Sequence, residues 1–193
     1  PANRVFRTLH TSTTVGLGRH EDALREYRAL VDEGGAEGND LAELHLSIAH
    51  SLKTLWRREE AIEAYRTAAA VRPDFGDAYW SLANLKTYAF SDEQMQQMMT
   101  AEAAPETATI DRVNLCFALG KGFEDRRDFG KASLFYGRGN DLKRAGSRYR
   151  ADLIELNTAN QRRVCTSAFF AARAGWGSAS EAPIFIVGLP RSG

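Results

Sequence analysis

Three copies of one short pattern constrain this chain more than any other feature. In each copy an alanine is followed four residues later by a tyrosine, and a short polar turn precedes the alanine. The small residue lets two antiparallel helices approach closely, and the aromatic side chain one turn further on fills the gap to the next helix. The pattern therefore predicts an all-α chain of repeated helical hairpins. The pairs are Ala23–Tyr27, Ala61–Tyr65 and Ala132–Tyr136.

The spacing of equivalent positions supports a repeat. Ile48 and Leu82 are 34 residues apart, whereas Ala23 and Ala61 are 38 apart. The extra residues fall in the polar stretch 33–40, where a loop should lie, because insertions in repeat arrays belong in loops. The predicted hairpins are helices 4–17 with 19–33, 40–56 with 58–72, 76–90 with 91–101, and 111–126 with 128–144.

Two helix starts carry a capping signature. Asp40-x-x-Glu43 and Ser91-x-x-Gln94 match the capping box, in which a short polar side chain and a Glu or Gln three residues later satisfy free backbone N–H groups. The third hairpin is degenerate, because Met95 replaces the usual alanine. The methionines of that helix are interpreted as soft core fillers.

These features together resemble tetratricopeptide (TPR) repeats. Leu119-Gly120-x₂-Phe123 precedes the third Ala-x₃-Tyr pair, and Pro73 follows Ala61 by twelve residues, as in that family. The resemblance covers roughly residues 4–144, and we assign 1–144 to a TPR domain. It implies a curved solenoid of about four repeats, whose concave face is lined by the first helix of each hairpin and can hold an extended peptide.

The register of the repeats predicts which side chains face the groove. A subset of the family clamps a C-terminal carboxylate with Lys, Asn and Arg, but only one asparagine matches here, and two aromatic residues stand where polar ones are required. The groove is therefore expected to hold either a peptide or protein partner or the protein's own catalytic domain. The candidate groove residues are His50, Lys53, Trp80, Asn84, Tyr88, Phe117 and Lys121.

The C-terminal residues carry a second pattern. Ile184 to Val187 is a short apolar run rich in β-branched residues, which predicts a buried strand. Gly188 and Gly193 then bracket four residues, the spacing of a phosphate-binding loop in which glycines let backbone N–H groups turn toward an anion. An arginine in such a loop suits a dianionic phosphate, because its guanidinium can bond two oxygens at once.

The stretch 183–193, Pro-Ile-Phe-Ile-Val-Gly-Leu-Pro-Arg-Ser-Gly, resembles the 5′-phosphosulfate-binding loop of sulfotransferases. The lead-in 169–177 is similar to the segment before that loop in bacterial proteins that join TPR repeats to a sulfotransferase domain. The resemblance implies a parent enzyme that transfers a sulfuryl group from 3′-phosphoadenosine 5′-phosphosulfate to a hydroxyl or amine acceptor. It also implies that the co-substrate contacts Gly188, Pro190, Arg191, Ser192 and Gly193.

Two alternatives stay open. A Walker-type nucleotide-binding loop needs Lys and then Ser or Thr directly after the second glycine, so the residue after Gly193 decides between these classes. In the second alternative the repeats are the functional region and act as a peptide-binding or assembly scaffold. The chain starts at Pro1 and ends inside the loop pattern, which predicts a fragment of a longer protein. On this interpretation 145–182 is a capping helix and linker, and 183–193 begins a truncated α/β domain.

No catalytic residue can be named, because the sulfotransferase base would lie beyond residue 193. The fragment is expected to be non-catalytic and to bind no cofactor. Lys+Arg and Asp+Glu are both 25, so the sequence lacks the basic excess of nucleic-acid binding. No apolar run approaches the ~18 residues of a membrane span. The histidine and cysteine spacings predict no metal site. A second copy of the chain is a further candidate partner.

The number and spacing of the cysteines indicate the redox state of the compartment in which the protein resides. Cys116 and Cys165 are widely spaced and lie among apolar neighbours. We expect both to be buried free thiols in a reducing compartment, which favours the cytoplasm.

Overall fold

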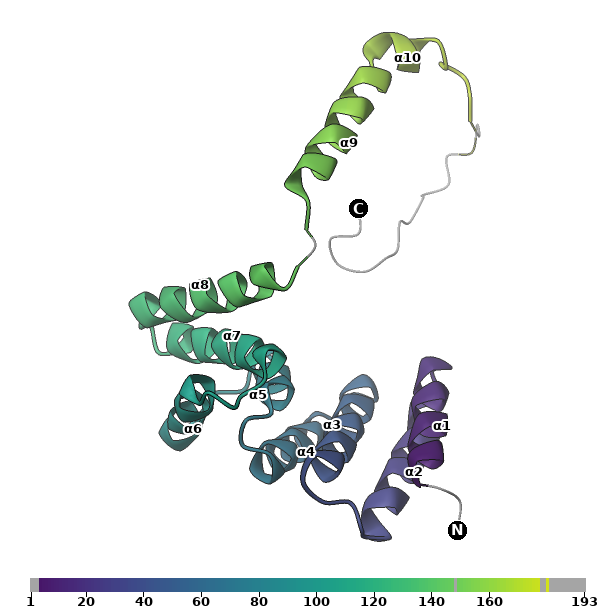
Figure 1. Cartoon of the computed structure of the whole chain (residues 1–193). Helices are drawn as coiled ribbons and strands as arrows, with labels where there is room; N and C mark the ends of the chain where they lie inside the picture. The colour runs from purple at the N-terminus through teal and green to yellow at the C-terminus, as the bar shows by residue number, and fades with distance from the viewer. Residues whose placement is uncertain (1–3, 148, 178–179, 181–193) are drawn as a thin grey trace. The chain divides into compact units, whose positions relative to one another are not determined.

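The computed structural model describes residues 4–147, 149–177 and 180 (Figure 1). These residues form ten α-helices and no strand, and the chain divides into two compact units, residues 1–147 and 148–193. The predicted strand and phosphate-binding loop at 183–193 lie outside the described residues. The helices are α1 Arg4–Gly16, α2 His20–Asp32, α3 Gly38–Thr54, α4 Arg58–Val71, α5 Gly76–Ala83, α6 Asp92–Ala103, α7 Thr109–Asp125, α8 Phe129–Ala145, α9 Ala151–Val164 and α10 Ser167–Ala171.

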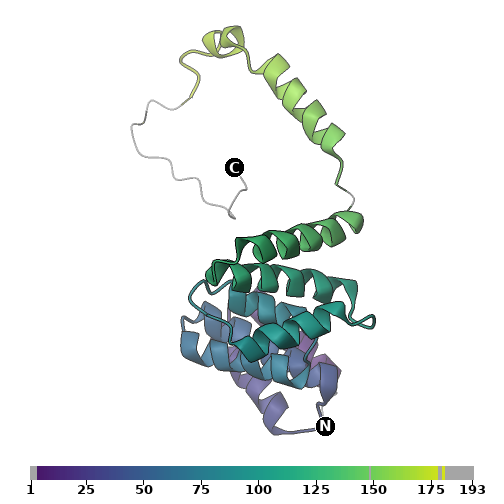
Figure 2. The same cartoon turned by 90° about the vertical axis from the view of Figure 1, so that its left-hand side faces the viewer.

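The first unit is a series of helical hairpins, as predicted. α1 packs on α2, α3 on α4 and α7 on α8, while α2 contacts α3 and α4 contacts α5, so each hairpin rests on the next. Figures 1 and 2 both show α7 and α8 side by side. Five of the six predicted alanine and tyrosine positions are buried in the core, with Ala23, Ala61 and Tyr65 fully buried, whereas Tyr136 is half-buried. The expectation of an all-α hairpin fold is therefore confirmed for the described residues.

The third hairpin departs from the predicted one. We predicted a helix over 76–90, but α5 ends at Ala83, and Lys86 adopts a left-handed conformation (φ 60°). The chain then folds back so that Phe90 enters the core beside Tyr79, with ring centroids 6.5 Å apart. α5 and α6 each pack mainly on α7 rather than on each other. The apolar sequence pattern continues past Ala83 because the loop after α5, and not the helix itself, supplies a buried ring, that of Phe90.

One of the two predicted capping boxes forms. Ser91 caps α6 by accepting from the Gln94 N–H, and the Gln94 side chain accepts from the Ser91 N–H. The box expected at Asp40 and Glu43 is wrong, because α3 begins at Gly38 and places Asp40 inside its first turn. An acidic residue there still suits the positive end of the helix dipole.

The three regular hairpins share one turn geometry. Five residues before each packing alanine, the chain takes a left-handed conformation, at Gly18 (φ 76°), Trp56 (φ 62°) and Arg127 (φ 59°). At each turn the left-handed residue donates to the carbonyl three residues back, and the next residue donates to the carbonyl five residues back. This pattern closes the end of the first helix and satisfies its free carbonyls. Only the first turn uses glycine, the residue that adopts this conformation at least cost.

We expect Arg127→Gly to stabilise the first unit by about 1 kcal/mol, because glycine relieves the left-handed strain and the Arg127 side chain is exposed. Gly18→Ala should destabilise it by a similar amount, since it introduces that strain at the equivalent position. Urea unfolding followed by circular dichroism would measure both. Two shifts of the same sign would contradict the equivalence of the turns.

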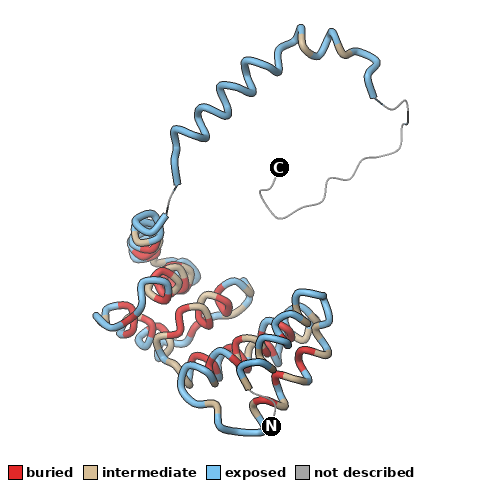
Figure 3. The backbone as a smooth tube through the Cα atoms, turned by 45° about the vertical axis from the view of Figure 1, so that its right-hand side comes forward, coloured by how far each residue is buried: buried red, intermediate tan, exposed pale blue. Residues whose placement is uncertain are grey.

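The second unit contains α9 and α10, which have no buried residue (Figure 3). Helices were expected between residues 149 and 170, and they are present. Their role as a cap on the repeats stays a prediction. Cys116 is buried, as predicted, but the expectation for Cys165 is wrong, because this residue follows α9 and is exposed. Among the described residues no helix has the length and apolar character needed to cross a bilayer.

Candidate functional site

Polar groups from three helices form a connected set: His50 on α3, Tyr65 on α4, and Asp77 and Ser81 on α5. The Tyr65 hydroxyl lies 2.8 Å from His50 Nδ1, and the two rings meet edge to face. Ser81 Oγ donates to Asp77 Oδ1 at 3.2 Å. Desolvation lowers the pKa of His50 and raises the pKa of Tyr65 to about 12, so both groups are neutral near pH 7. Neutral donors and acceptors of this kind suit hydrogen bonding to a peptide backbone.

The lowered pKa of His50 makes stability depend on pH. The unfolded chain binds a proton at the ordinary histidine pKa, whereas the folded chain resists protonation, so stability should fall as pH drops below about 6.5. We expect His50→Gln, which keeps a hydrogen-bonding group beside Tyr65, to lose less stability between pH 7 and pH 5.5 than the unsubstituted chain. Urea midpoints at the two pH values would test this. His10→Gln is the control, and an equal loss in all three proteins would contradict the assignment.

Aromatic residues from α5, α7 and α8 form a second cluster. The Trp80 and Phe117 ring centroids are 5.5 Å apart, and those of Phe117 and Tyr136 are 6.5 Å apart. The Lys143 ammonium lies 6.0 Å from the Phe117 centroid. Trp80 and Phe117 are only half-buried, so the structure brings together two of the predicted groove residues and leaves part of each ring accessible. We call Trp80 and Phe117 the aromatic pair.

The other predicted groove residues are more dispersed. Lys53 and Asn84 are exposed at the C-terminal ends of α3 and α5, and Lys121 is paired with Asp125 within α7. Tyr88 does not join the aromatic pair. Its hydroxyl bonds Gln94 and its ring packs on Phe90, so it lines a different hollow with residues of α4 and α6. The early end of α5 explains the difference, because Tyr88 follows the helix instead of continuing its inner face.

A hollow of about 320 Å³ lies between α1 and α3. The sequence patterns predicted no site residue on α1, although Val5 and Leu9 stand four residues apart, the spacing of an apolar helical stripe, and both are exposed in the structure. We call this space the α1–α3 hollow. Its lining residues are Arg4, Val5, Thr8, Leu9, Ser12, Asp40, Glu43, Leu44 and Ser47.

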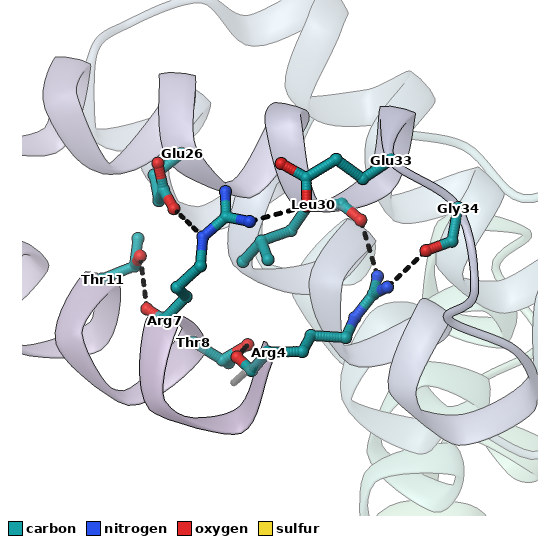
Figure 4. A network of polar contacts seen from close by, with 8 residues as sticks. All are labelled: Arg4, Arg7, Thr8, Thr11, Glu26, Leu30, Glu33 and Gly34. Carbon is teal, nitrogen blue, oxygen red and sulfur yellow. Dashed lines mark hydrogen bonds and ion pairs between the residues drawn. The ribbon is translucent and has the colours of Figure 1, made fainter. Parts of the chain in front are cut away.

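Two arginines hold α1 against α2 beside this hollow (Figure 4). Arg4 donates to the carbonyls of Leu30 and Gly34, at the C-terminal end of α2, where a cation also suits the helix dipole. Arg7 pairs with Glu26 and Glu33, each at 2.6 Å. Both guanidinium groups are therefore engaged with α2.

The buried titratable groups of α6 and α7 do not form a reactive site. The Cys116 thiol lies 3.5 Å from Glu102 Oε1, to which Arg138 Nε also donates at 3.0 Å. Burial raises the pKa of Cys116 to about 12, which keeps it a thiol and suppresses nucleophilic reactivity. The described residues also contain no group of three or more His, Cys, Asp or Glu side chains placed to hold a metal ion.

Comparison with known proteins supports the fold and leaves the activity open. No family model matches the chain. An uncharacterized protein of Aquifex aeolicus is 30% identical over 148 residues, which are 76% of this chain but 19% of that protein. The chain therefore spans about a fifth of the relative's length. The crystal structure of BtubC (BKLC) from P. vanneervenii matches with a TM-score of 0.55 and 19% identity, over 76% of this chain and 65% of that one. This likeness concerns the fold.

Proposed function

We propose that residues 4–145 form a TPR-type interaction module whose inner face binds an extended peptide segment. The observation that carries the proposal is the aromatic pair: Trp80 and Phe117 lie on the first helices of adjoining hairpins, their ring centroids are 5.5 Å apart with the planes tilted by 45°, and both rings remain partly accessible. Tryptophan is over-represented among the residues that contribute most to protein interfaces. Asn84 and Asn114 on the same helical stretches add exposed or half-buried amides that can bond a peptide backbone.

The described polar groups near the groove are engaged with one another or buried. His50 shares a hydrogen bond with the Tyr65 hydroxyl, and Cys116 of α7 is buried against Glu102 of α6. A mixed surface of aromatic faces, amides and separated charges suits recognition of side chains along an extended chain. A peptide-binding scaffold is thus the role that the geometry supports best.

A random-peptide library displayed on phage would test the groove. Peptides selected on the chain should be synthesised and their affinity measured by fluorescence anisotropy. We expect Trp80→Ala to weaken binding about thirtyfold, corresponding to ~2 kcal/mol for an aromatic hot spot. Trp56→Ala is the matched control, because Trp56 is 92% exposed on a hairpin turn. Equal affinities for the two variants would refute the proposal.

For the longer protein to which this chain would belong, we propose sulfuryl transfer from 3′-phosphoadenosine 5′-phosphosulfate. The support is the sequence 183–193, where Arg191 and Ser192 stand between two glycines after an apolar run. On this proposal Arg191 and Ser192 bind the 5′-phosphate, Gly193 allows its close approach, and charge stabilisation of a nearly in-line transfer supplies the catalysis. The repeats then recruit the acceptor or brace the enzyme.

Calorimetric titration of a chain extended past Gly193 would test this second proposal. We expect micromolar binding of 3′-phosphoadenosine 5′-phosphate that is lost on Arg191→Ala. Binding of ATP–Mg²⁺ alone would move the loop to the Walker class, and binding of neither nucleotide would leave the interaction module as the functional part.

A further inference from the structure

The α1–α3 hollow combines apolar walls with unpaired negative charge. On the α1 side, Val5 and Leu9 are 66% and 63% exposed, which is unusual for two aliphatic residues on one helical face. On the α3 side, Asp40 and Glu43 line the same space. The volume of about 320 Å³ is at the small end for a binding pocket and fits one or two side chains.

The two carboxylates lack partners within the part of the chain that the structure describes. No hydrogen bond or ion pair joins the Asp40 or Glu43 side chain to another described residue, although most acidic side chains of this unit are paired. Arg72 acts on Glu43 at longer range, but it is itself paired with Asp111. Both carboxylates therefore remain available to an external cation.

The cation that already lines the hollow is committed elsewhere. Arg4 lines the hollow, while its guanidinium donates to two carbonyls at the end of α2 (Figure 4). Long basic side chains commonly pack their stems on apolar surface while the charged head bonds elsewhere. The charge of Arg4 is thus already balanced by the α2 terminus and is not free to neutralise Asp40 or Glu43.

We propose that the α1–α3 hollow binds an arginine or lysine of a peptide ligand, with an adjacent aliphatic residue of that ligand resting on Val5 and Leu9. The occupant is a segment of a partner protein, and this assignment rests on the proposed peptide-binding function. Charge complementarity selects the basic residue, and the exposed aliphatic wall selects its apolar neighbour. The hollow would add a second recognition point on the first helices of the first two hairpins, whereas the aromatic pair lies on α5 and α7.

The state of Glu43 agrees with this assignment. Burial raises the pKa of its carboxyl, and the nearby acids Asp77, Asp111 and Asp40 raise it further, while Arg72 lowers it. A peptide cation placed in the hollow would offset both the desolvation and the repulsion among these acids. Such a site favours a cationic ligand and disfavours an acidic one.

The test uses a fluorescent, capped peptide with the central sequence Gly-Arg-Leu-Gly and the full chain at low salt. Anisotropy should report binding that weakens about tenfold in the double variant Asp40→Asn/Glu43→Gln, as expected for loss of two partly exposed charge pairs. The control Glu59→Gln/Glu155→Gln removes the same net charge at exposed sites and should leave the affinity unchanged. A peptide with citrulline in place of arginine keeps the shape without the charge and should not distinguish the two variants.

Three results would overturn the inference: no binding of the arginine peptide, equal weakening in both double variants, or equal binding of a Gly-Glu-Leu-Gly peptide. Binding of the library-selected peptide, which depends on Trp80, distinguishes a failure of this inference from a failure of the proposed function. If that peptide still binds, the groove function stands and only the basic specificity of the hollow is wrong. If neither peptide binds, both proposals fail.

Discussion

Replacing Gly76 by alanine is expected to destabilise the first unit by about 3 kcal/mol, the upper end for overpacking in a well-packed core. Gly76 begins α5, where the helix crosses the first turn of α7. A Cβ atom on Gly76 would lie 2.2 Å from the Asp111 carbonyl oxygen and 2.8 Å from two further backbone atoms of that residue. Because the obstacle is backbone, relief requires α5 and α7 to separate.

Two other glycines provide graded controls. A Cβ on Gly122 would meet the Met95 Sδ at 2.4 Å, but the end of a methionine can move, so Gly122→Ala should cost about 1 kcal/mol. Gly137 in α8 has nothing within 4 Å, and Gly137→Ala should stabilise by about 1 kcal/mol through helix propensity. Urea unfolding would rank the three variants. If Gly76→Ala were as mild as Gly122→Ala, the close crossing of α5 and α7 would be wrong.

At the same crossing of α5 and α7, the single substitution Asp111→Ala is expected to lower the free energy of unfolding by ~3 kcal/mol, in the range for breaking a buried ion pair. Asp111 is 5% exposed; its Oδ1 accepts from the Gly76 N–H at 3.0 Å, and its Oδ2 accepts from Arg72. Alanine would leave the buried Gly76 N–H and Arg72 Nη2 without their acceptor, while Arg72 Nε keeps its bond to Asp74 Oδ1 at 3.2 Å. Burial raises the pKa of Asp111 even though Arg72 lowers it, so the carboxylate depends on these donors.

The substitution Asp111→Asn separates the two contributions. Its side-chain oxygen can still accept from Gly76 while the charge opposite Arg72 is lost, so Asp111→Asn should cost less than Asp111→Ala. Asp125→Ala, which removes an intrahelical pair with Lys121 at a more exposed site, should change stability by less than about 0.5 kcal/mol. Thermal unfolding would give all three values, and equal effects at 111 and 125 would contradict the structural role of the buried pair.

The sequence predicted the hairpins where packing and turn chemistry agree. The Ala-x₃-Tyr pairs placed six helices of the first, second and fourth hairpins within a few residues of their ends, because the same residues that mark the pattern also fill the core. The third hairpin was predicted less well. Its apolar residues continue through 85–90, and only the left-handed turn at Lys86, which has no glycine to signal it, ends α5.

The groove was predictable in part for a similar reason. Helical register brought Trp80 and Phe117 to one face, since both lie inside regular helices. Tyr88 was misplaced with the end of α5. The α1–α3 hollow was missed, because the spacing of Val5 and Leu9 signals only one of its walls. That Arg4 turns away toward α2 is a long-range contact that no local pattern encodes.

The attachment of α1 differs from that of the other hairpin helices, and this difference has a dynamic consequence. Thr11 is the one buried residue of α1, and much of what holds the helix is the set of arginine contacts to α2. Elements with little buried apolar surface open with a free energy below that of global unfolding. Amide protons of α1 should thus exchange with solvent before those of α3 and α7, and faster as salt screens its ion pairs. A ligand that bridges α1 and α3 would slow this exchange. Binding in the α1–α3 hollow would therefore be detected as slower amide exchange of α1, the most loosely held helix of the first unit.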